Sequence, residues 1–253
     1  MARTKSSVDW VDLETETLYV RDRKLLSMIK EFDFIDAIFH TWLHKKASLT
    51  EKKMLNSLMV AFCGGWSITV PVILSARLAA TTRAPMAQCL AAGFCAGGPS
   101  HTSAIQKSME VYVSTPLDHI DGYVENALGK GERIPGFGHP ILDRDPRPKV
   151  LRKLFAESGI KGDAVRKFDR IEAILSKRKG IYGNIDGIGG AILLDLGFKD
   201  PSFGPAFFLI GRSLSMTAHI IEEYKNKPFS VLEIIHPGFK KMDYEYADRL
   251  EAD

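Results

Sequence analysis

The sequence predicts a mostly α-helical fold, and two observations lead to that expectation. Apolar residues recur at three- and four-residue spacings over most of the chain, which places them on one face of a helix. Alternating runs rich in β-branched residues, the pattern of strands, are nearly confined to "TLYVRD" at 17–22. The sequence also contains no internal repeat and no low-complexity linker.

Length and composition allow one large domain or two modest ones with a real core, since the chain has 253 residues. Hydrophobic residues make up 45% and charged residues 26%, as in ordinary soluble proteins. The net charge of +3 is small and no basic stripe with interleaved aromatics occurs, so no nucleic-acid partner is expected. Local basic patches remain able to hold a phosphorylated small ligand.

The helices are expected in the following order. Residues 22–46 have helical apolar spacing throughout, and Ser48 with Glu51 forms a capping box for a helix that starts at Leu49. Further helices are expected at 70–80, 85–96, 102–113, 148–158, 164–175, 188–196 and 203–224. The polar end of the chain, 236–253, is expected to be extended and to reach a partner subunit.

Two uncharged stretches, Leu58–Ala76 and Ala84–Gln106, require a choice between a membrane span and buried helices. A spanning helix needs about 20 strongly apolar residues, whereas these stretches are small-residue-rich and broken by glycine and proline. We favour helices buried on all sides, with a subunit interface as one setting for them. Because one chain of this size gives them little cover, we expect an obligate homodimer, with a higher oligomer left open.

The cysteines and the N-terminus indicate a cytoplasmic protein. Cys63, Cys89 and Cys95 lie in apolar surroundings without C-x-x-C spacing, so buried thiols are expected in place of disulfides or a zinc site. The first residues turn acidic at once and have no apolar core, so no secretory signal is expected.

The first candidate site is "AGGPSHTSAIQK", where Pro99 and Ser100 break one helix and His101 is expected at the start of the next. Backbone dipoles at a helix N-terminus disfavour the imidazolium. A neutral His101 could donate a hydrogen bond to a carbonyl oxygen. The alternative is a helix-capping histidine without chemistry.

The second candidate is "RIPGFGHPILDRDPR" at 133–147, where glycines and prolines hold a single His139 in a stiff bend. Gly136 and Gly138 let backbone amides approach a ligand closely. Arg144 and Arg147 can grip phosphate or carboxylate with two hydrogen bonds. The alternative is a rigid loop between helices.

The third candidate is "GNIDGIGGAILLDLGF", with Asp186 just before an apolar helix. Asp186 could be a general base with apolar walls, or it could simply cap that helix. Gly187, Gly189 and Gly190 match a dinucleotide fingerprint only weakly, because no strand is expected before them.

Taken in order, "GGPSH", "PGFGHPILDRDPR", "NIDGIGGAILLDLGF" and "FFLIGRSLSMTAHIIEE" resemble the citrate synthase superfamily. The likeness is closest to citryl-CoA lyase and to the citrate synthase-homology module of ATP-citrate lyase, and it covers about 18–228. It implies a large helical domain, 1–114 with 181–253 including the tail, and a small helical subdomain at 115–180. The higher charge of that middle stretch and its bend fit such a subdomain.

The resemblance also implies residue roles. His101 matches the histidine that hydrogen-bonds the thioester carbonyl and stabilises its enol, and His139 the one that polarises the acid partner's carbonyl or hydroxyl. Asp186 matches the base for the acyl α-proton, and Arg147 and Arg212 match arginines that hold carboxylates. The coenzyme A contacts are expected from Arg144 and from the turn formed by Ile134, Pro135, Gly136, Phe137 and Gly138.

The sequence departs from the family pattern at two places. Cys63 and Gly64 stand where relatives carry an Asp-His pair that grips the acid, and Lys227-Pro228 replaces an arginine-proline signature. His101 in "GP-x-H" follows the synthases, whereas "NIDG" and "GRS" look like the lyases. Neither the acid nor the direction of reaction follows from these features.

The resulting expectation is a citryl-CoA lyase that uses a coenzyme A thioester as substrate and no resident cofactor or metal. The first alternative is a synthase-like enzyme that condenses acetyl-CoA or propionyl-CoA with a 2-oxo acid. The second is a non-catalytic coenzyme A-binding homologue, which the missing Asp-His pair favours and the retained His101, His139 and Asp186 oppose. A nicotinamide-dependent oxidoreductase has only the weak glycine pattern in its favour.

Overall fold

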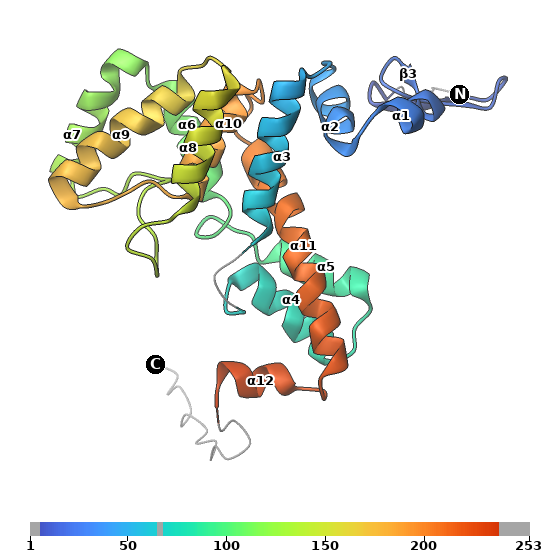
Figure 1. Cartoon of the computed structure of the whole chain (residues 1–253). Coiled ribbons are helices and arrows are strands. Elements are labelled where there is room, and N and C mark those ends of the chain that lie inside the picture. Colours follow the sequence, from blue (N-terminus) through green and yellow to red (C-terminus); the bar gives the residue numbers. More distant parts are fainter. Residues whose placement is uncertain (1–5, 65–67, 238–253) are drawn as a thin grey trace, which may run out of the picture. The chain divides into compact units, whose positions relative to one another are not determined.

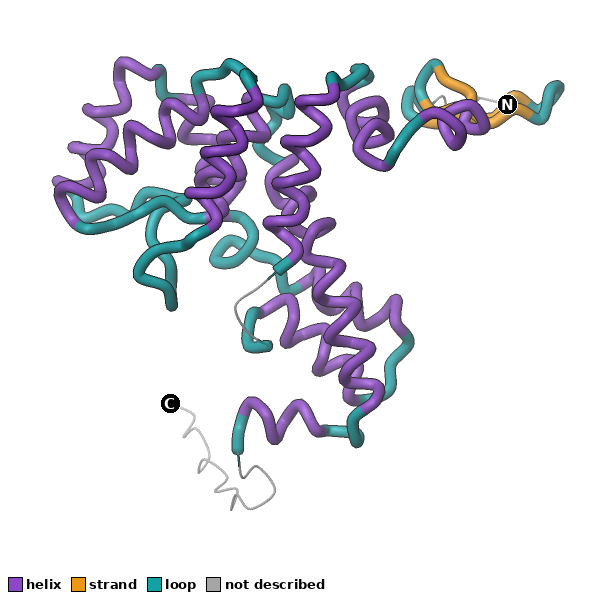
Figure 2. The backbone as a smooth tube through the Cα atoms, viewed as in Figure 1, coloured by secondary structure: helices purple, strands orange, loops and turns teal. Residues whose placement is uncertain are grey.

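The computed structural model describes residues 6–64 and 68–237, and they are mostly helical, as predicted (Figures 1 and 2). The chain forms two compact units: 1–62 with 102–211, and 63–101 with 212–253. A small antiparallel sheet, order β1-β2-β3, lies near the N-terminus. Its strands are β1 (Asp9–Asp12), β2 (Thr17–Val20) and β3 (Arg23–Lys24), with Asp9 opposite Val20.

The helices divide between the units as follows. The first unit contains α1 (Leu25–Glu31), α2 (Phe34–Leu43), α3 (Leu49–Cys63), α6 (Ala104–Ser114), the 3-10 turn η1 (Leu117–His119), α7 (Ile120–Gly129), α8 (Arg147–Ser158), α9 (Ala164–Lys179) and α10 (Ile185–Asp195). The second contains α4 (Pro71–Thr81), α5 (Met86–Cys95) and α12 (Ser230–Ile235). The long helix α11 (Phe203–Lys225) contributes residues to both units.

The single helix predicted at 22–46 is wrong, because the chain breaks it at Asp33. The Asp33 side chain accepts from the Asp36 N–H at 2.8 Å, and the Asp36 side chain accepts from the Asp33 N–H at 3.2 Å. This capping box starts α2 afresh. The predicted box before α3 is confirmed, with Ser48 N–H donating to Glu51 at 2.8 Å and Glu51 N–H to Ser48 Oγ at 3.2 Å.

Helix α10 is the centre of the first unit and is buried along most of its length against α6, α8 and α9. A Cβ on Gly189 would lie 2.9 Å from the Phe62 ring, and one on Gly190 would lie 2.9 Å from Met109. These glycines are therefore explained by close helix packing. Within the described residues no strand lies directly before α10, so the dinucleotide interpretation gains no support.

In the second unit, α4 packs on α5, and α11 closes over both through Gly93, where a Cβ would lie 2.6 Å from Met216 Sδ. The burial on all sides predicted for Leu58–Ala76 and Ala84–Gln106 is wrong for the single chain, since Val60 and Phe94 are 65% and 39% exposed. The predicted burial of the thiols is confirmed for Cys89, which is buried, and wrong for Cys95, which is exposed. No helix in the described part of the chain is long and apolar enough to cross a membrane.

The predicted subdomain, 115–180, contains α7, α8 and α9, and these pack with α6 and α10 inside the first unit. Helix α7 is an addition to the predicted helices. The boundaries of the compact units do not coincide with the predicted ones, and the predicted division into a large domain and a subdomain stays a prediction. The extended tail expected at 236–253 lies almost wholly outside the described residues.

Candidate active site

The predicted coenzyme A turn, residues 134–138, lies directly against the start of α10. Gly138 N–H donates to the Tyr182 carbonyl at 2.7 Å, and Asn184 N–H donates to the Gly136 carbonyl at 2.9 Å. Gly136 has φ +85°, and a Cβ there would lie 2.5 Å from the Gly187 Cα. Glycine is therefore required on both sides of this backbone crossing.

The turn is also supported from beneath by α9. The Phe137 ring stacks on Phe168 with centroids 5.3 Å apart. Glu172 accepts from Gly183 N–H at 2.9 Å and from Arg152 Nη2 at 2.5 Å. Polar and aromatic contacts thus fix the turn on two sides.

The first turn of α10 carries Asp186, but its cap is Asn184. Asn184 Oδ1 accepts from the N–H groups of Asp186 and Gly187 at 3.0 and 3.2 Å, and its Nδ2 donates to the Gly138 carbonyl at 2.6 Å. The alternative that Asp186 caps the helix is therefore wrong. Asp186 Oδ1 is buried, and the base role of this carboxylate stays a prediction.

His139 is held in one ring orientation by its own loop. Its Nδ1 accepts from Leu142 N–H at 2.9 Å and from Ile141 N–H at 3.2 Å, which places the proton of the neutral ring on Nε2. Burial lowers the pKa of His139; the charge of Asp145 opposes this shift, and that of Arg147 adds to it. A neutral imidazole that donates from Nε2 can polarise a carbonyl oxygen.

Two arginines of the bend, Arg144 and Arg147, differ in their surroundings. Arg144 is exposed, and its guanidinium lies 4.5 Å from the centre of the Tyr182 ring. Arg147 is half-buried and donates from Nε and Nη2 to the two carboxylate oxygens of Asp145, each at 2.8 Å. Sequence reasoning missed Asp145, although an aspartate before Pro-x at a helix start is a signal for a side chain that caps backbone N–H groups.

His101 and Arg212 belong to the second unit. His101 lies in a turn closed by two hydrogen bonds with Gly98, of 2.8 and 2.9 Å, three residues before α6 begins. The predicted position at a helix N-terminus is therefore wrong. The pKa of His101 is nevertheless lowered, first by burial and then by the charge of Arg212, which is itself 3% exposed.

The predicted site residues thus fall into two groups. His139, Arg147 and Asp186 share the hydrogen-bonded loop and helix start of the first unit, whereas His101 and Arg212 are neighbours in the second. Within residues 6–64 and 68–237, no group of three or more His, Cys, Asp or Glu side chains is placed to hold a metal ion.

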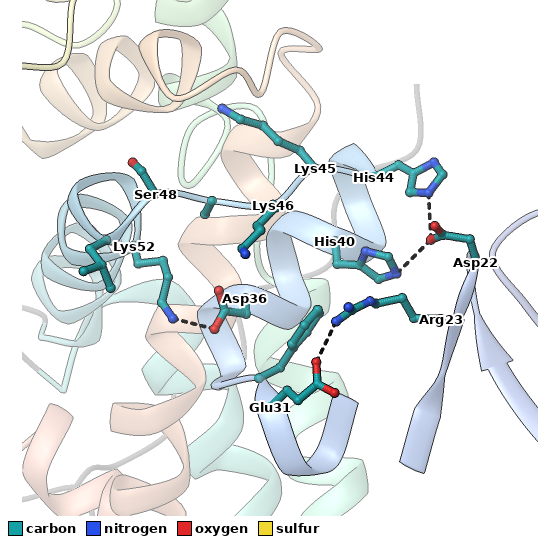
Figure 3. A pocket seen from close by; sticks show the side chains of 13 residues that line it. Asp22, Arg23, Glu31, Asp36, His40, His44, Lys45, Lys46, Ser48 and Lys52 are labelled. Atoms are coloured by element: carbon teal, nitrogen blue, oxygen red, sulfur yellow. Dashed lines mark hydrogen bonds and ion pairs between the residues drawn. The ribbon is translucent and has the colours of Figure 1, made fainter. Parts of the chain in front are cut away.

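A cavity of about 680 Å³ at the N-terminal end of the first unit has none of the predicted residues in its wall (Figure 3). Its acidic groups pair with its own cations and histidines: Glu31 with Arg23 at 3.0 Å, Asp22 with His44 at 2.8 Å, and Asp36 with Lys52. A second, apolar cavity of about 410 Å³ lies between α3 and α8 and has Arg147 in its wall.

Comparison with known proteins assigns the chain to a family. Residues 12–238 match the family model described as "Citrate synthase, C-terminal domain". The solved citryl-CoA lyase of Hydrogenobacter thermophilus superposes with a TM-score of 0.84 at 25% identity, over 98% of this chain and 97% of that one. The ATP citrate lyase of Methanothrix soehngenii, solved with citrate and coenzyme A, gives 0.81 at 18% identity over 97% and 42%, which supports the fold alone.

Curated sequences show the same relationship over shorter segments. Citrate synthase of Heyndrickxia coagulans is 26% identical over 58% of this chain, and 2-methylcitrate synthase 2 of Corynebacterium glutamicum is 31% identical over 51%. The matched segments cover 41% and 35% of those relatives, so the chain spans less than half their length.

Proposed function

This chain belongs to the citrate synthase family, and from that premise we propose that it is a carbon–carbon lyase acting on citryl-CoA. The products would be acetyl-CoA and oxaloacetate. The observation that carries the proposal is the superposition on citryl-CoA lyase, with a TM-score of 0.84 over nearly the full length of both chains, whereas the citrate synthase of Thermotoga maritima gives 0.59 over a similar share of both chains.

The residues of the first unit supply the chemistry at the acid. In cleavage, His139 and Asp186 assist loss of the tertiary hydroxyl proton, and the carbonyl of oxaloacetate forms as the carbon–carbon bond breaks. The electron pair of that bond passes to the thioester as an enolate, whose oxygen His101 stabilises by a hydrogen bond. Asp186, which has taken up the hydroxyl proton, then donates it to the α-carbon, and acetyl-CoA results. The reverse sequence gives condensation.

Binding is divided between the turn and the arginines. Backbone groups of 134–138 and the exposed Arg144 would hold coenzyme A, and Arg147 with Arg212 would hold carboxylates of the acid. Coenzyme A is therefore a substrate in this proposal and no group is permanently bound.

A homodimer in the cytoplasm, with further assembly possible, is part of the same proposal. The exposed Leu78 on α4 and Phe94 on the uncharged helix α5 support it, because such side chains gain from cover by a second chain. Sedimentation at micromolar concentration tests it, and a stable, well-folded monomer would contradict it.

A synthase-like condensation is the second candidate, favoured by the curated relatives, which are citrate and 2-methylcitrate synthases. The deciding experiment incubates the protein with citryl-CoA, and separately with acetyl-CoA or propionyl-CoA and a panel of 2-oxo acids, followed by mass spectrometry. Faster cleavage of citryl-CoA supports the lyase, and net condensation with another acid supports the synthase. A protein that neither cleaves nor condenses, and does not exchange acyl α-protons with heavy water, is the non-catalytic homologue.

A further inference from the structure

Asp145 is a buried carboxylate at the junction of the bend and α10. Its side chain is 0% exposed. Oδ1 accepts from the backbone N–H of Arg147 at 3.0 Å and from its Nε at 2.8 Å. Oδ2 accepts from Arg147 Nη2 at 2.8 Å and from the N–H of Ile185, the first residue of α10, at 2.9 Å.

These four donors account for the acceptor capacity of the carboxylate, which is about four lone-pair sites. Asp145 therefore has no acceptor left for a substrate, and any contribution to the reaction passes through its neighbours. Those neighbours are the guanidinium of Arg147 and the first turn of α10, where Asp186 follows Ile185 directly.

We propose that Asp145 is a positioning residue that sets the orientation of Arg147 and fixes it relative to the helix start that carries Asp186; this rests on the proposed function. The Nε–Nη2 edge of Arg147 faces Asp145, so the acid carboxylate is received at the Nη1 end of the guanidinium. One planar group thereby links two carboxylates, which a lysine cannot do in the same geometry.

The test variant is Asp145→Asn, and its matched control is Asp195→Asn. Two further variants, Arg147→Ala alone and the double variant Asp145→Asn with Arg147→Ala, show whether the two residues act through the same contact. Asp195 is a partly buried carboxylate in the same unit that accepts from the backbone N–H groups of Ala164 and Val165 at 3.1 and 3.0 Å. Calorimetry on the full chain measures the affinities for oxaloacetate and for coenzyme A, and thermal unfolding measures stability.

Asp145→Asn should weaken oxaloacetate binding roughly 10- to 100-fold, the range of one lost charge-assisted hydrogen bond, with the coenzyme A affinity unchanged. In the double variant the loss should not exceed that of Arg147→Ala, because both changes remove the same contact. Asp195→Asn should leave both affinities unchanged.

Losses that multiply in the double variant, or oxaloacetate and coenzyme A affinities that fall together, would overturn the positioning role. Failure of the proposed function would look different, since wild-type protein would then bind no 2-oxo acid at all.

Discussion

The two units hold their predicted site residues by different means. In the first, the bend and α10 are joined at Gly136, Gly138 and Asn184 by backbone and side-chain hydrogen bonds. In the second, His101 lies in a turn closed by two backbone hydrogen bonds with Gly98. Helix α4 is linked to α11 by the buried Arg77–Glu223 ion pair. The difference indicates that variants in the first unit should affect reaction geometry, whereas the ion pair of the second should affect stability.

The largest effect is expected from Asp186→Asn. The change removes the proposed base, and general-base contributions are about 10²- to 10⁴-fold in rate. Deuterium uptake at the acyl α-carbon should fall by that factor, with an acid analogue bound where wild-type exchange requires one. Stability should survive, because the cap of α10 is Asn184. Coenzyme A affinity is the control, and exchange at the wild-type rate would refute the base role.

Glu223→Gln should give the largest loss of stability. The Glu223 side chain is fully buried and accepts from Arg77 at 2.8 Å, from Ser230 Oγ at 3.0 Å and from Val231 N–H at 3.3 Å. Breaking a buried pair costs about 3–5 kcal/mol, whereas an exposed pair contributes at most about 1 kcal/mol. Urea unfolding should therefore separate Glu223→Gln from Asp121→Asn, which removes the exposed pair with Arg170. Equal free energies of unfolding for the two variants would show that the buried ion pair of the second unit contributes no more stability than the exposed pair of the first.

A smaller effect is expected from Gly187→Ala at the crossing of the bend and α10. The new Cβ would lie 2.4 Å from the Gly136 carbonyl oxygen, and overpacking of this kind costs about 1–3 kcal/mol. The KM for the coenzyme A ester should rise as the turn shifts. Gly122→Ala in α7 is the control, because its Cβ meets nothing within 4 Å and the change should stabilise by up to about 1 kcal/mol. Similar melting temperatures for both variants would show that the backbone at Gly136 can move away from α10 without loss of stability.

Local signals explain which features could be predicted from the sequence. The capping box of Ser48 and Glu51 and the turn glycines were readable, because each acts within a few residues. The break at Asp33 was not, since apolar periodicity continues across it. Asn184 and Asp186 are both cap-forming types, and only the backbone path decides between them. The link from Asp145 to Ile185 joins residues 40 apart, which no local pattern reveals.

The smallest effect concerns pH and compares the two histidines. Burial lowers the pKa of His101 and of His139, so more than half of each ring population should be neutral at pH 6.5, near the ordinary pKa of histidine. The folded protein then binds fewer protons than the unfolded chain, and stability should rise with pH through about 6.5 and be lost below it.

Histidine ring signals in NMR should titrate below those of N-acetylhistidine amide, with His139 in the Nε2–H form. Because the charge of Asp145 raises the pKa of His139, Asp145→Asn should lower that pKa further and leave His101 unchanged. Titration of either ring above about 6.5 would show that burial does not control these groups, and an equal shift of both would show that Asp145 does not act on the bend alone.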